Sequence, residues 1–344
     1  MTTLLDPDSV GPWLAKYFRG CAARGLVAGI DDDDCAVMRW HHSLLVVTTD
    51  FLNATPIAIQ LGIATYRALG ELIVASNISD LCGTGARPQA LLIGAMFRRC
   101  TPVTQFREFM SGVRRACQKW KTQLIGGDTK LGERDAFFGV AIGSAPSRRS
   151  LFLKNSARAG DLIWVSGHVG DCAAATVVLG GDMKDICPRG PLIQTITSPR
   201  LPLEKSKAVS SLMLGRGGID ISDGLRVSLA RMASASDVGA KIALDQIPVS
   251  PAVTKISRAL QVPPWSFAFA SGGDFQFLVT TSSRAKTQMR RLGFFEIGSV
   301  TDSRVLRFTE TGKKVALPEI GHEDRRSTDF CSEIRTIVEE LKQC

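Results

Sequence analysis

The stretch from Gly218 to Leu225 constrains the fold of this chain more than any other. Its residues, Gly-Ile-Asp-Ile-Ser-Asp-Gly-Leu, alternate apolar and polar side chains as a buried strand does. Apolar residues then recur at helical spacing, at Leu225, Leu229 and Met232. We therefore expect a strand that leads into a helix capped by Ser222 or Asp223, with Asp220 and Asp223 at the junction.

A strand-to-helix junction of this kind can hold a phosphate or a metal–phosphate complex, because its backbone N–H groups point outward. A capped helix that follows a strand, as in any α/β protein, is the simpler interpretation. The sequence repeats the pattern in Asn77-Ile78-Ser79-Asp80-Leu81. Further Asp-bearing turns are expected at residues 31–34, 126–129 and 271–275, and a strand from Leu44 is expected to end on Asp50. Two of the turns have ordinary alternatives, an exposed acidic loop for the first and a hairpin turn for the second.

The length and composition indicate a globular protein of two domains. The chain has 344 residues, of which 44% are hydrophobic and 22% charged. A basic link containing proline, Pro146-Ser147-Arg148-Arg149, is the best boundary, so we expect domains at 1–147 and 148–344. A helix is expected from about Gln60 to Gly83, and an amphipathic one from Glu333 to Lys342.

Several classes of protein are disfavoured by the sequence. The N-terminus lacks a basic region followed by an apolar run, and apolar stretches such as Ala90–Phe97 are too short to cross a bilayer, which predicts a cytoplasmic protein without membrane contact. The nine cysteines are scattered without a C-x-x-C pair, as expected of reduced thiols. The net charge of +9 suits an anionic substrate, but the basic residues are dispersed doublets, which favours solvated surface over a nucleic-acid face.

The clustered carboxylates, without a matching set of His or Cys, favour hard-cation chemistry. Mg²⁺ is bound through a few carboxylates together with substrate phosphates. The chain has no P-loop motif and no set of protein-kinase motifs, so a nucleotide would be held through metal and backbone. The four histidines are dispersed and no nucleophile elbow is present, which disfavours a nucleophile–base pair.

An ordered set of motifs resembles the thiamine-monophosphate kinase family from about residue 26 to 308. The motifs are Asp33-Asp34-Cys35-Ala36, Thr48-Thr49-Asp50, Asn77-Ile78-Ser79-Asp80 with Gly85-Ala86-Arg87-Pro88, Gly126-Gly127-Asp128-Thr129, Ala159-Gly160-Asp161, Pro199-Arg200, Asp220-Ile221-Ser222-Asp223-Gly224-Leu225 and Ser271-Gly272-Gly273-Asp274-Phe275. The resemblance implies a two-domain, PurM-like α+β fold. In that fold an N-terminal domain forms a β-barrel across a homodimer, a C-terminal domain is α/β, and ATP lies in the cleft between them.

The resemblance also implies roles for individual residues. The positions that match Mg²⁺ ligands are Asp33, Asp34, Asp50, Asp80, Asp128 and Asp223, where the four-Asp run leaves the choice between the first two open. The positions that match nucleotide-binding residues are Gly126, Gly127, Thr129, Lys154, Ser222 and Asp274. Asp128 and Asp223 are the expected catalytic pair. The reaction would be in-line transfer of the γ-phosphoryl group of ATP to the phosphate of a small-molecule acceptor.

Two departures from the family pattern affect the acceptor half of the site. The segment after Asp50 lacks the Gly-Val-His-Phe that the family usually has, and Gln276 replaces a glutamate. Loss of an acid would weaken binding of a cationic thiazolium ring. Two other functions therefore stay open: a ligase or synthetase of the same superfamily that acts through a phosphorylated intermediate, and a nucleotide-binding homologue without catalysis.

Overall fold

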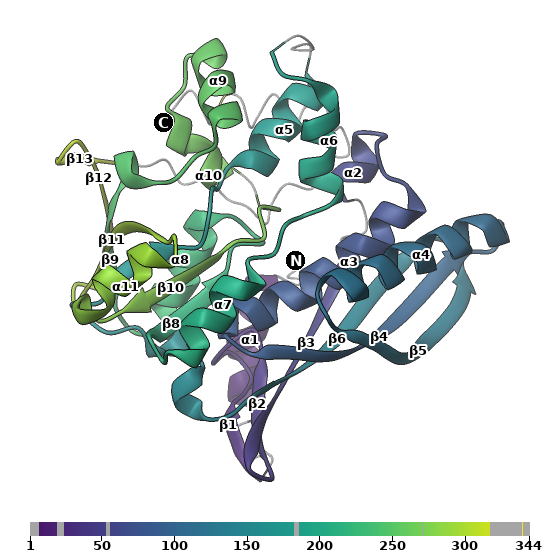
Figure 1. Ribbon diagram of the computed structural model, residues 1–344, viewed down its shortest axis with the longest axis horizontal. Coiled ribbons are helices and arrows are strands. Elements are labelled where there is room, and N and C mark those ends of the chain that lie inside the picture. The colour runs from purple at the N-terminus through teal and green to yellow at the C-terminus, as the bar shows by residue number, and fades with distance from the viewer. Residues whose placement is uncertain are drawn as a thin grey trace, which may run out of the picture.

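The chain forms two mixed β-sheets, one from each half of the sequence, with helix α3 (Tyr66–Thr84) between them (Figure 1). The computed structural model describes residues 7–18, 24–52, 56–181, 186–270, 272–316 and residue 339. Residues 26–145 supply the first sheet and residues 162–315 the second. Each sheet buries hydrophobic clusters of its own, which confirms the expected two-domain α+β fold.

The first sheet has the strand order β1-β2-β3-β6-β4-β5. Its strands are β1 (Leu26–Ala28), β2 (Ala36–Trp40), β3 (Ser43–Leu52), β4 (Arg87–Arg98), β5 (Gln123–Gly132) and β6 (Ala136–Ala145). Neighbours are antiparallel except β4 and β5, which run parallel, and β5 forms an edge. Helices α3 and α4 (Val103–Lys119) cover one face, where Phe97 and Phe137 pack against Phe109 of α4. The described strands do not close into a barrel.

Helix α3 has clear signals at both ends. Thr65 caps the N-terminus by accepting a hydrogen bond from the N–H of Ala68, and Gly85 ends the helix in the left-handed conformation at φ 81°. The expected start near Gln60 is wrong, because a separate short helix, α2 (Ile57–Gln60), precedes α3. Near its C-terminus Gly83 lies against the backbone of Asp220 in the second sheet, where an added Cβ would come within 2.5 Å of the Asp220 nitrogen. This close approach joins the two domains.

The second sheet has the order β13-β12-β9-β11-β7-β10-β8. Its strands are β7 (Leu162–Val165), β8 (Gly215–Asp220), β9 (Gly239–Ala243), β10 (Phe277–Thr281), β11 (Phe295–Thr301), β12 (Leu306–Glu310) and β13 (Lys313–Val315). The remaining helices are α1 (Pro7–Tyr17), α5 (Asp171–Gly180), α6 (Arg189–Thr197), α7 (Leu203–Ser211), α8 (Leu225–Ala235), α9 (Pro251–Leu260), α10 (Phe267–Ala270) and α11 (Lys286–Arg291). None of the helices in the described ranges has the length and hydrophobicity of a membrane span.

The structure corrects several expectations about local structure. Gly126–Thr129 lies within strand β5 and is not a turn. Gly224 is the N-cap of α8, and neither Ser222 nor Asp223 makes a side-chain cap. The apolar stripe of α8 is as expected, since Leu225, Leu229 and Met232 are buried. The helix expected from residue 333 to 342 lies outside the described residues, apart from residue 339.

Candidate active site

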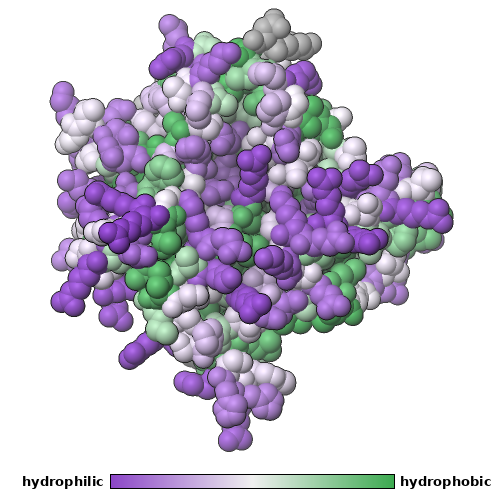
Figure 2. Space-filling model, viewed as in Figure 1, coloured by the Kyte–Doolittle hydropathy of each residue, from purple (hydrophilic) through white to green (hydrophobic). Residues whose placement is uncertain are grey.

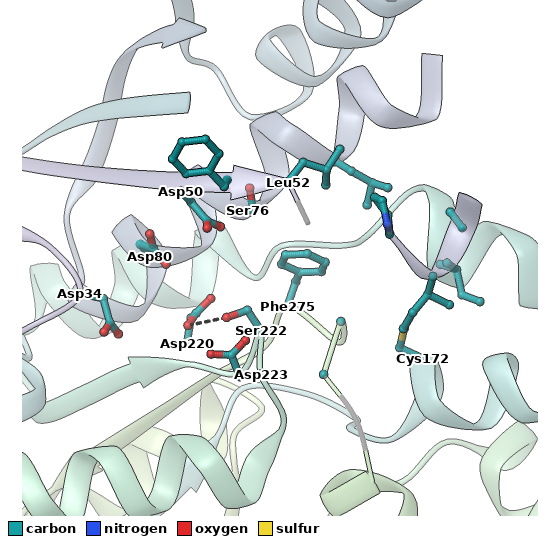
Figure 3. A pocket seen from close by; sticks show the side chains of 18 of the residues that line it. Asp34, Asp50, Leu52, Ser76, Asp80, Cys172, Asp220, Ser222, Asp223 and Phe275 are labelled. Atoms are coloured by element: carbon teal, nitrogen blue, oxygen red, sulfur yellow. Dashed lines mark hydrogen bonds between the residues drawn. The ribbon is translucent and has the colours of Figure 1, made fainter. Parts of the chain in front are cut away.

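A pocket of about 430 Å³ lies between the two domains and has two chemically different ends (Figure 3). One end is lined by the five carboxylates of Asp34, Asp50, Asp80, Asp220 and Asp223. The other end is mostly apolar and is lined by residues that include Leu52, Ile57, Leu72, Cys172, Ile196 and Phe275. Figure 2, drawn in the view of Figure 1, shows many hydrophilic residues on this face of the molecule, with hydrophobic residues scattered among them. The pocket can therefore hold a charged group and an apolar group side by side.

The five carboxylates come from different elements of both domains. Asp34 precedes β2, Asp50 is near the end of β3 and Asp80 is on α3, which places three of them in the N-terminal half. Asp220 ends β8 and Asp223 is in the turn before α8. The Ile-Ser-Asp segments around residues 80 and 223 therefore face each other across the domain boundary. A direct contact joins them, because the Ser79 hydroxyl donates to Asp220 at 2.6 Å.

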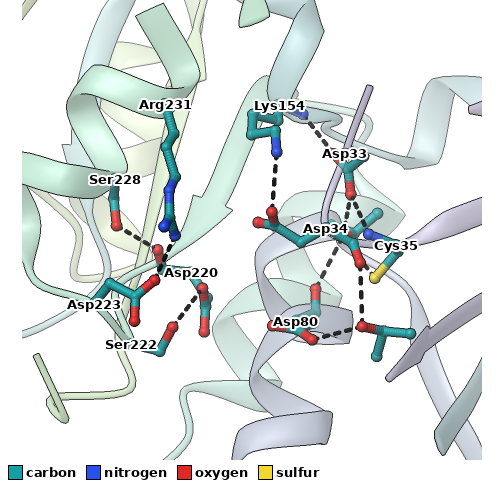
Figure 4. Close-up of polar contacts among 12 residues, drawn as sticks. Asp33, Asp34, Cys35, Asp80, Lys154, Asp220, Ser222, Asp223, Ser228 and Arg231 are labelled. Atoms are coloured by element: carbon teal, nitrogen blue, oxygen red, sulfur yellow. Dashed lines mark hydrogen bonds and ion pairs between the residues drawn. The ribbon is translucent and has the colours of Figure 1, made fainter. Parts of the chain in front are cut away.

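Hydroxyl groups and two cationic side chains hold these carboxylates (Figure 4). Thr48 donates to Asp80 at 2.6 Å, and Ser222 donates to Asp220 at 3.1 Å. The ammonium group of Lys154, in the short 3-10 helix Lys154–Ser156, lies 3.0 Å from Asp34. The guanidinium group of Arg231 on α8 donates to Asp223.

Burial and mutual repulsion raise the pKa of the carboxylates deepest in the pocket. Burial is the larger cause for Asp80 and Asp220, and the charges of neighbouring aspartates add to it. The pKa of Asp220 rises to about 8, and that of Asp80 rises well above its usual value. Burial also raises the pKa of Asp50. A divalent cation would relieve this repulsion, so the site is built to accept positive charge.

The donor set fits Mg²⁺ held jointly by protein and phosphate. All of the pocket's acidic ligands are oxygen donors, which Mg²⁺ prefers. Among the described residues, no three His, Cys, Asp or Glu side chains are close enough to hold an ion by themselves. Mg²⁺ commonly keeps several waters and binds through one or two carboxylates plus substrate phosphates. The oxygen donors that line the pocket therefore suit Mg²⁺ held jointly with substrate phosphates.

The structure distinguishes Asp33 from Asp34. Asp33 accepts hydrogen bonds from the backbone N–H groups of Cys35 at 3.0 Å and Lys154 at 2.6 Å, and from the hydroxyl of Thr84 at 3.1 Å. Burial, with the charge of Asp34, raises its pKa to about 6. Asp34, and not Asp33, lines the pocket. Asp33 thus ties the Lys154 segment to the first domain, while Asp34 faces the cavity.

The Gly-Gly-Asp-Thr segment lies apart from the other candidates. Gly126, Gly127, Asp128 and Thr129 are exposed on the edge strand β5 and are not among the residues that line the pocket. The side chain of Asp128 is 67% exposed and lies 3.5 Å from the ammonium group of Lys130. In the sheet order, β5 is three strands from β3, which carries Asp50. Three strand spacings amount to about 14 Å, which is beyond the reach of an aspartate side chain.

Asp274 accepts hydrogen bonds at the start of helix α5 and does not line the pocket. Its carboxylate accepts hydrogen bonds from the backbone N–H groups of Gly170 at 2.6 Å and Cys172 at 2.9 Å. Burial raises its pKa to about 7. The adjacent residues Gly273 and Phe275 do line the pocket. Asp274 therefore holds two pocket walls together, α5 and the loop that carries Phe275.

Gln276, where the family pattern has a glutamate, also stays out of the cavity lining. Its amide oxygen accepts a hydrogen bond from Ser166 at 2.9 Å. Its amide nitrogen donates to the carbonyl oxygens of Arg200 at 3.3 Å and Asp274 at 3.4 Å. The substitution therefore leaves the acidic end of the pocket unchanged.

Two residues have larger roles in the geometry than the sequence indicated. Asp220, which the sequence made a weaker and structural member of the aspartate set, lines the pocket and accepts a hydrogen bond from Ser79 across the domain boundary. Arg231 was missed. Its position eight residues after Asp223, about two helical turns, was the available signal.

Comparisons with known proteins show which proteins this chain is similar to. Residues 32–145 match the N-terminal domain model of AIR synthase related proteins, and residues 158–310 match the C-terminal domain model. The thiamine-monophosphate kinase of Escherichia coli (strain K12) is 30% identical over 324 residues, which cover 90% of this chain and 96% of the relative. That of Pyrococcus horikoshii is 28% identical over 300 residues, covering 87% and 92%. A solved structure of AaThiL complexed with AMPPCP and TMP shares the fold, with a TM-score of 0.76 at 23% identity over 91% of this chain and 97% of that one.

Proposed function

We propose that this chain, which belongs to the thiamine-monophosphate kinase family, transfers the γ-phosphoryl group of ATP to thiamine monophosphate. The observation that carries the proposal is the convergence of five carboxylates from two domains on one end of a pocket whose other end is apolar. The first end suits a magnesium–triphosphate complex, and the second suits the rings of an organic acceptor.

In this proposal Asp34, Asp50, Asp80 and Asp223 hold the metal, and Ser222 and Asp220 support them. Bound Mg²⁺ supplies neutralisation of the charge that develops on the transferred phosphoryl group. The protein's own task is positioning. Lys154 adds a fixed positive charge beside Asp34, because its backbone N–H is bound by Asp33 and its carbonyl accepts from Ser236. No strong base is needed, because the acceptor is already a phosphate anion.

The apolar end of the pocket supports thiamine monophosphate as the acceptor. Phe275 presents an aromatic side chain between the carboxylates and the apolar wall (Figure 3). An aromatic face attracts a cationic ring, and the nearby carboxylates favour the same charge. Because Gln276 does not line the cavity, its replacement of a glutamate does not count against a thiazolium ring. Residues 53–55, which include part of the departure after Asp50, lie outside the described residues.

We also propose a homodimer in which β5 of one subunit completes the pocket of the other. The exposed edge strand β5 is a template for pairing. Two aromatic residues on the first sheet, Phe51 and Phe138, contact each other and are 63% and 39% exposed. A second copy that covers this sheet would close a barrel and bring Asp128, with Gly126, Gly127 and Thr129, toward the partner's phosphates.

We also propose a domain boundary after residue 147 and a cytoplasmic location. A boundary after residue 147 agrees with the two sheets, since one ends at Ala145 and the other begins at Leu162. A cytoplasmic location agrees with the cysteines of the described residues, which are free thiols such as Cys35, Cys82 and Cys117.

The test is incubation of the purified protein with ATP, Mg²⁺ and thiamine monophosphate, with chromatographic detection of products. Formation of thiamine diphosphate and ADP in equal amounts is expected. ADP and inorganic phosphate formed only with a different substrate and an amine would indicate the ligase or synthetase alternative. ATP binding without any turnover would indicate the non-catalytic alternative.

A further inference from the structure

Arg231 is a cation at the acidic end of the pocket. It lies two turns into helix α8, and its guanidinium group donates to the carboxylate of Asp223 (Figure 4). Both side chains line the pocket and are partly exposed to solvent, at 35% for Arg231 and 44% for Asp223. Neither family resemblance nor sequence pattern gave Arg231 a role. Because Arg231 contacts Asp223, an expected metal ligand, we asked what this arginine does in the site.

The other cation of the site, Lys154, differs from Arg231 in freedom and chemistry. The Lys154 side chain is only 10% exposed, and its backbone is fixed at both its N–H and its carbonyl. Arg231 instead reaches the pocket on a longer, more exposed side chain from a helix surface. A guanidinium group presents a planar fork that matches phosphate oxygens in pairs, whereas an ammonium group acts as a point charge. Arg231 is therefore suited to change partners.

A metal ion bound at Asp223 would share its carboxylate with Arg231. The Oδ2 atom of Asp223 accepts the hydrogen bond from Arg231. A divalent cation at Asp223 would compete for that oxygen and repel the guanidinium group, whereas the phosphates of ATP would attract it. The two ligands thus act on Arg231 in opposite directions.

We propose that Arg231 is an internal counter-ion that competes with Mg²⁺ for Asp223 and transfers to the phosphates of ATP when metal and nucleotide enter together. The proposal rests on the proposed nucleotide function. The exchange would favour binding of the metal–nucleotide complex over binding of free metal, because only the complex offers the guanidinium group a new partner.

The test measures binding without turnover, by isothermal titration calorimetry on the purified full chain. For Arg231→Gln, we expect Mg²⁺ alone to bind about fivefold more tightly than to the wild type, because the competitor for Asp223 is gone. We expect AMPPCP in saturating Mg²⁺ to bind about tenfold more weakly, because a charge-assisted phosphate contact is lost. Opposite changes in the two affinities are the signature of exchange.

Two variants serve as controls. Arg304→Gln removes another arginine–aspartate pair of the same domain, that with Asp237, at a position outside the pocket lining, and should change neither affinity. Arg231→Lys keeps the charge without the fork, so it should bind Mg²⁺ nearly as the wild type does and AMPPCP with intermediate affinity. It also serves if Arg231→Gln does not fold, as judged by circular dichroism.

Weaker binding of both ligands by Arg231→Gln, or no change in either, would overturn the exchange and leave Arg231 a structural residue. The same holds if Arg231→Lys binds Mg²⁺ more tightly than the wild type. Failure of the proposed function gives a different result. Wild-type protein that binds magnesium–AMPPCP without phosphorylating thiamine monophosphate would refute the acceptor while leaving the exchange intact.

Discussion

Asp223 and Asp128 have similar sequence surroundings and opposite structural ones. Each lies in a glycine-containing segment that follows apolar residues, and the sequence assigns both to metal binding. Asp223 lies in the pocket beside four other carboxylates, whereas Asp128 is exposed on the edge strand β5. Asp128 therefore lies outside the pocket that one chain forms. This difference shows that the order of strands in a sheet, and not the local motif, decides which carboxylates can meet.

The largest expected effect comes from removing a carboxylate inside the pocket. Asp80→Asn should lower kcat about a hundredfold or more, because it removes a negative charge that holds the metal–phosphate complex. The fold should be retained, since the amide oxygen can still accept the hydrogen bond from Thr48. Steady-state release of ADP measures the effect, with the exposed Asp302→Asn as control. Activity within a few-fold of the wild type would remove Asp80 from the site.

Pairing of the edge strand β5 with a second copy of the chain can be tested by substitution. Leu131 of β5 is 59% exposed, and Leu131→Asp should raise the dimer dissociation constant about tenfold or more, because a charge would be buried at the interface. Sedimentation velocity measures the change. Val103→Asp, on the exposed surface of α4, is the matched control and should leave the assembly unchanged. A wild-type monomer at all concentrations would refute the dimer.

Mixed dimers decide whether Asp128 acts in its own subunit or in the partner's pocket. Asp128→Asn and Asp223→Asn should each be inactive as homodimers. If the pocket is shared, random mixing yields half heterodimers with one intact site of two, so activity should recover to about a quarter of the wild type. Unfolding the two variants together and refolding them before assay provides the mixture. No recovery above the separate variants would show that Asp128 and Asp223 act from the same subunit.

A change of pH should have a smaller effect, on the stability of the protein, if only the pocket carboxylates are considered. Because the folded pKa of Asp220 is about 8 and those of Asp50 and Asp80 are also raised, the native state binds more protons than the unfolded state. Their contribution to stability is full below about pH 4 and is lost as pH rises through about 8. The Tm of metal-free protein should therefore fall across this window. Added Mg²⁺ should raise the Tm more at pH 8 than at pH 6, and an equal rise at both would contradict this.

The smallest expected effect concerns the acceptor. Gln276→Glu places carboxylate oxygens next to the carbonyls of Arg200 and Asp274, so the protein should lose about 1–2 kcal/mol of stability. The KM for thiamine monophosphate should change less than about twofold, because Gln276 does not line the pocket. Denaturant unfolding and initial rates measure the two effects, with the exposed Gln118→Glu as control. A large fall in KM would show that this position contacts the acceptor.

Much of the fold follows from local pattern. The helix after Asp223 has the apolar stripe of Leu225, Leu229 and Met232 at helical spacing, and all three residues are buried. The end of α3 follows from Gly85, which can adopt a left-handed conformation. The expected turn at Gly126–Thr129 was wrong because paired glycines permit a turn without requiring one, and pairing with β4 keeps the segment extended.

The sequence by itself determined the chemical character of the site: aspartates, serines and glycines at the ends of apolar segments, without histidine or cysteine ligands, and therefore a site for a hard cation and phosphate. Only the tertiary structure decided which of these residues meet. Asp34 and not Asp33 faces the cavity. Asp220 lines the site and accepts a hydrogen bond from Ser79, whereas Asp128 lies on an exposed edge strand. The reason is physical: residue type fixes what a side chain can bind, whereas distances between elements far apart in sequence depend on packing, such as the close approach of Gly83 to Asp220.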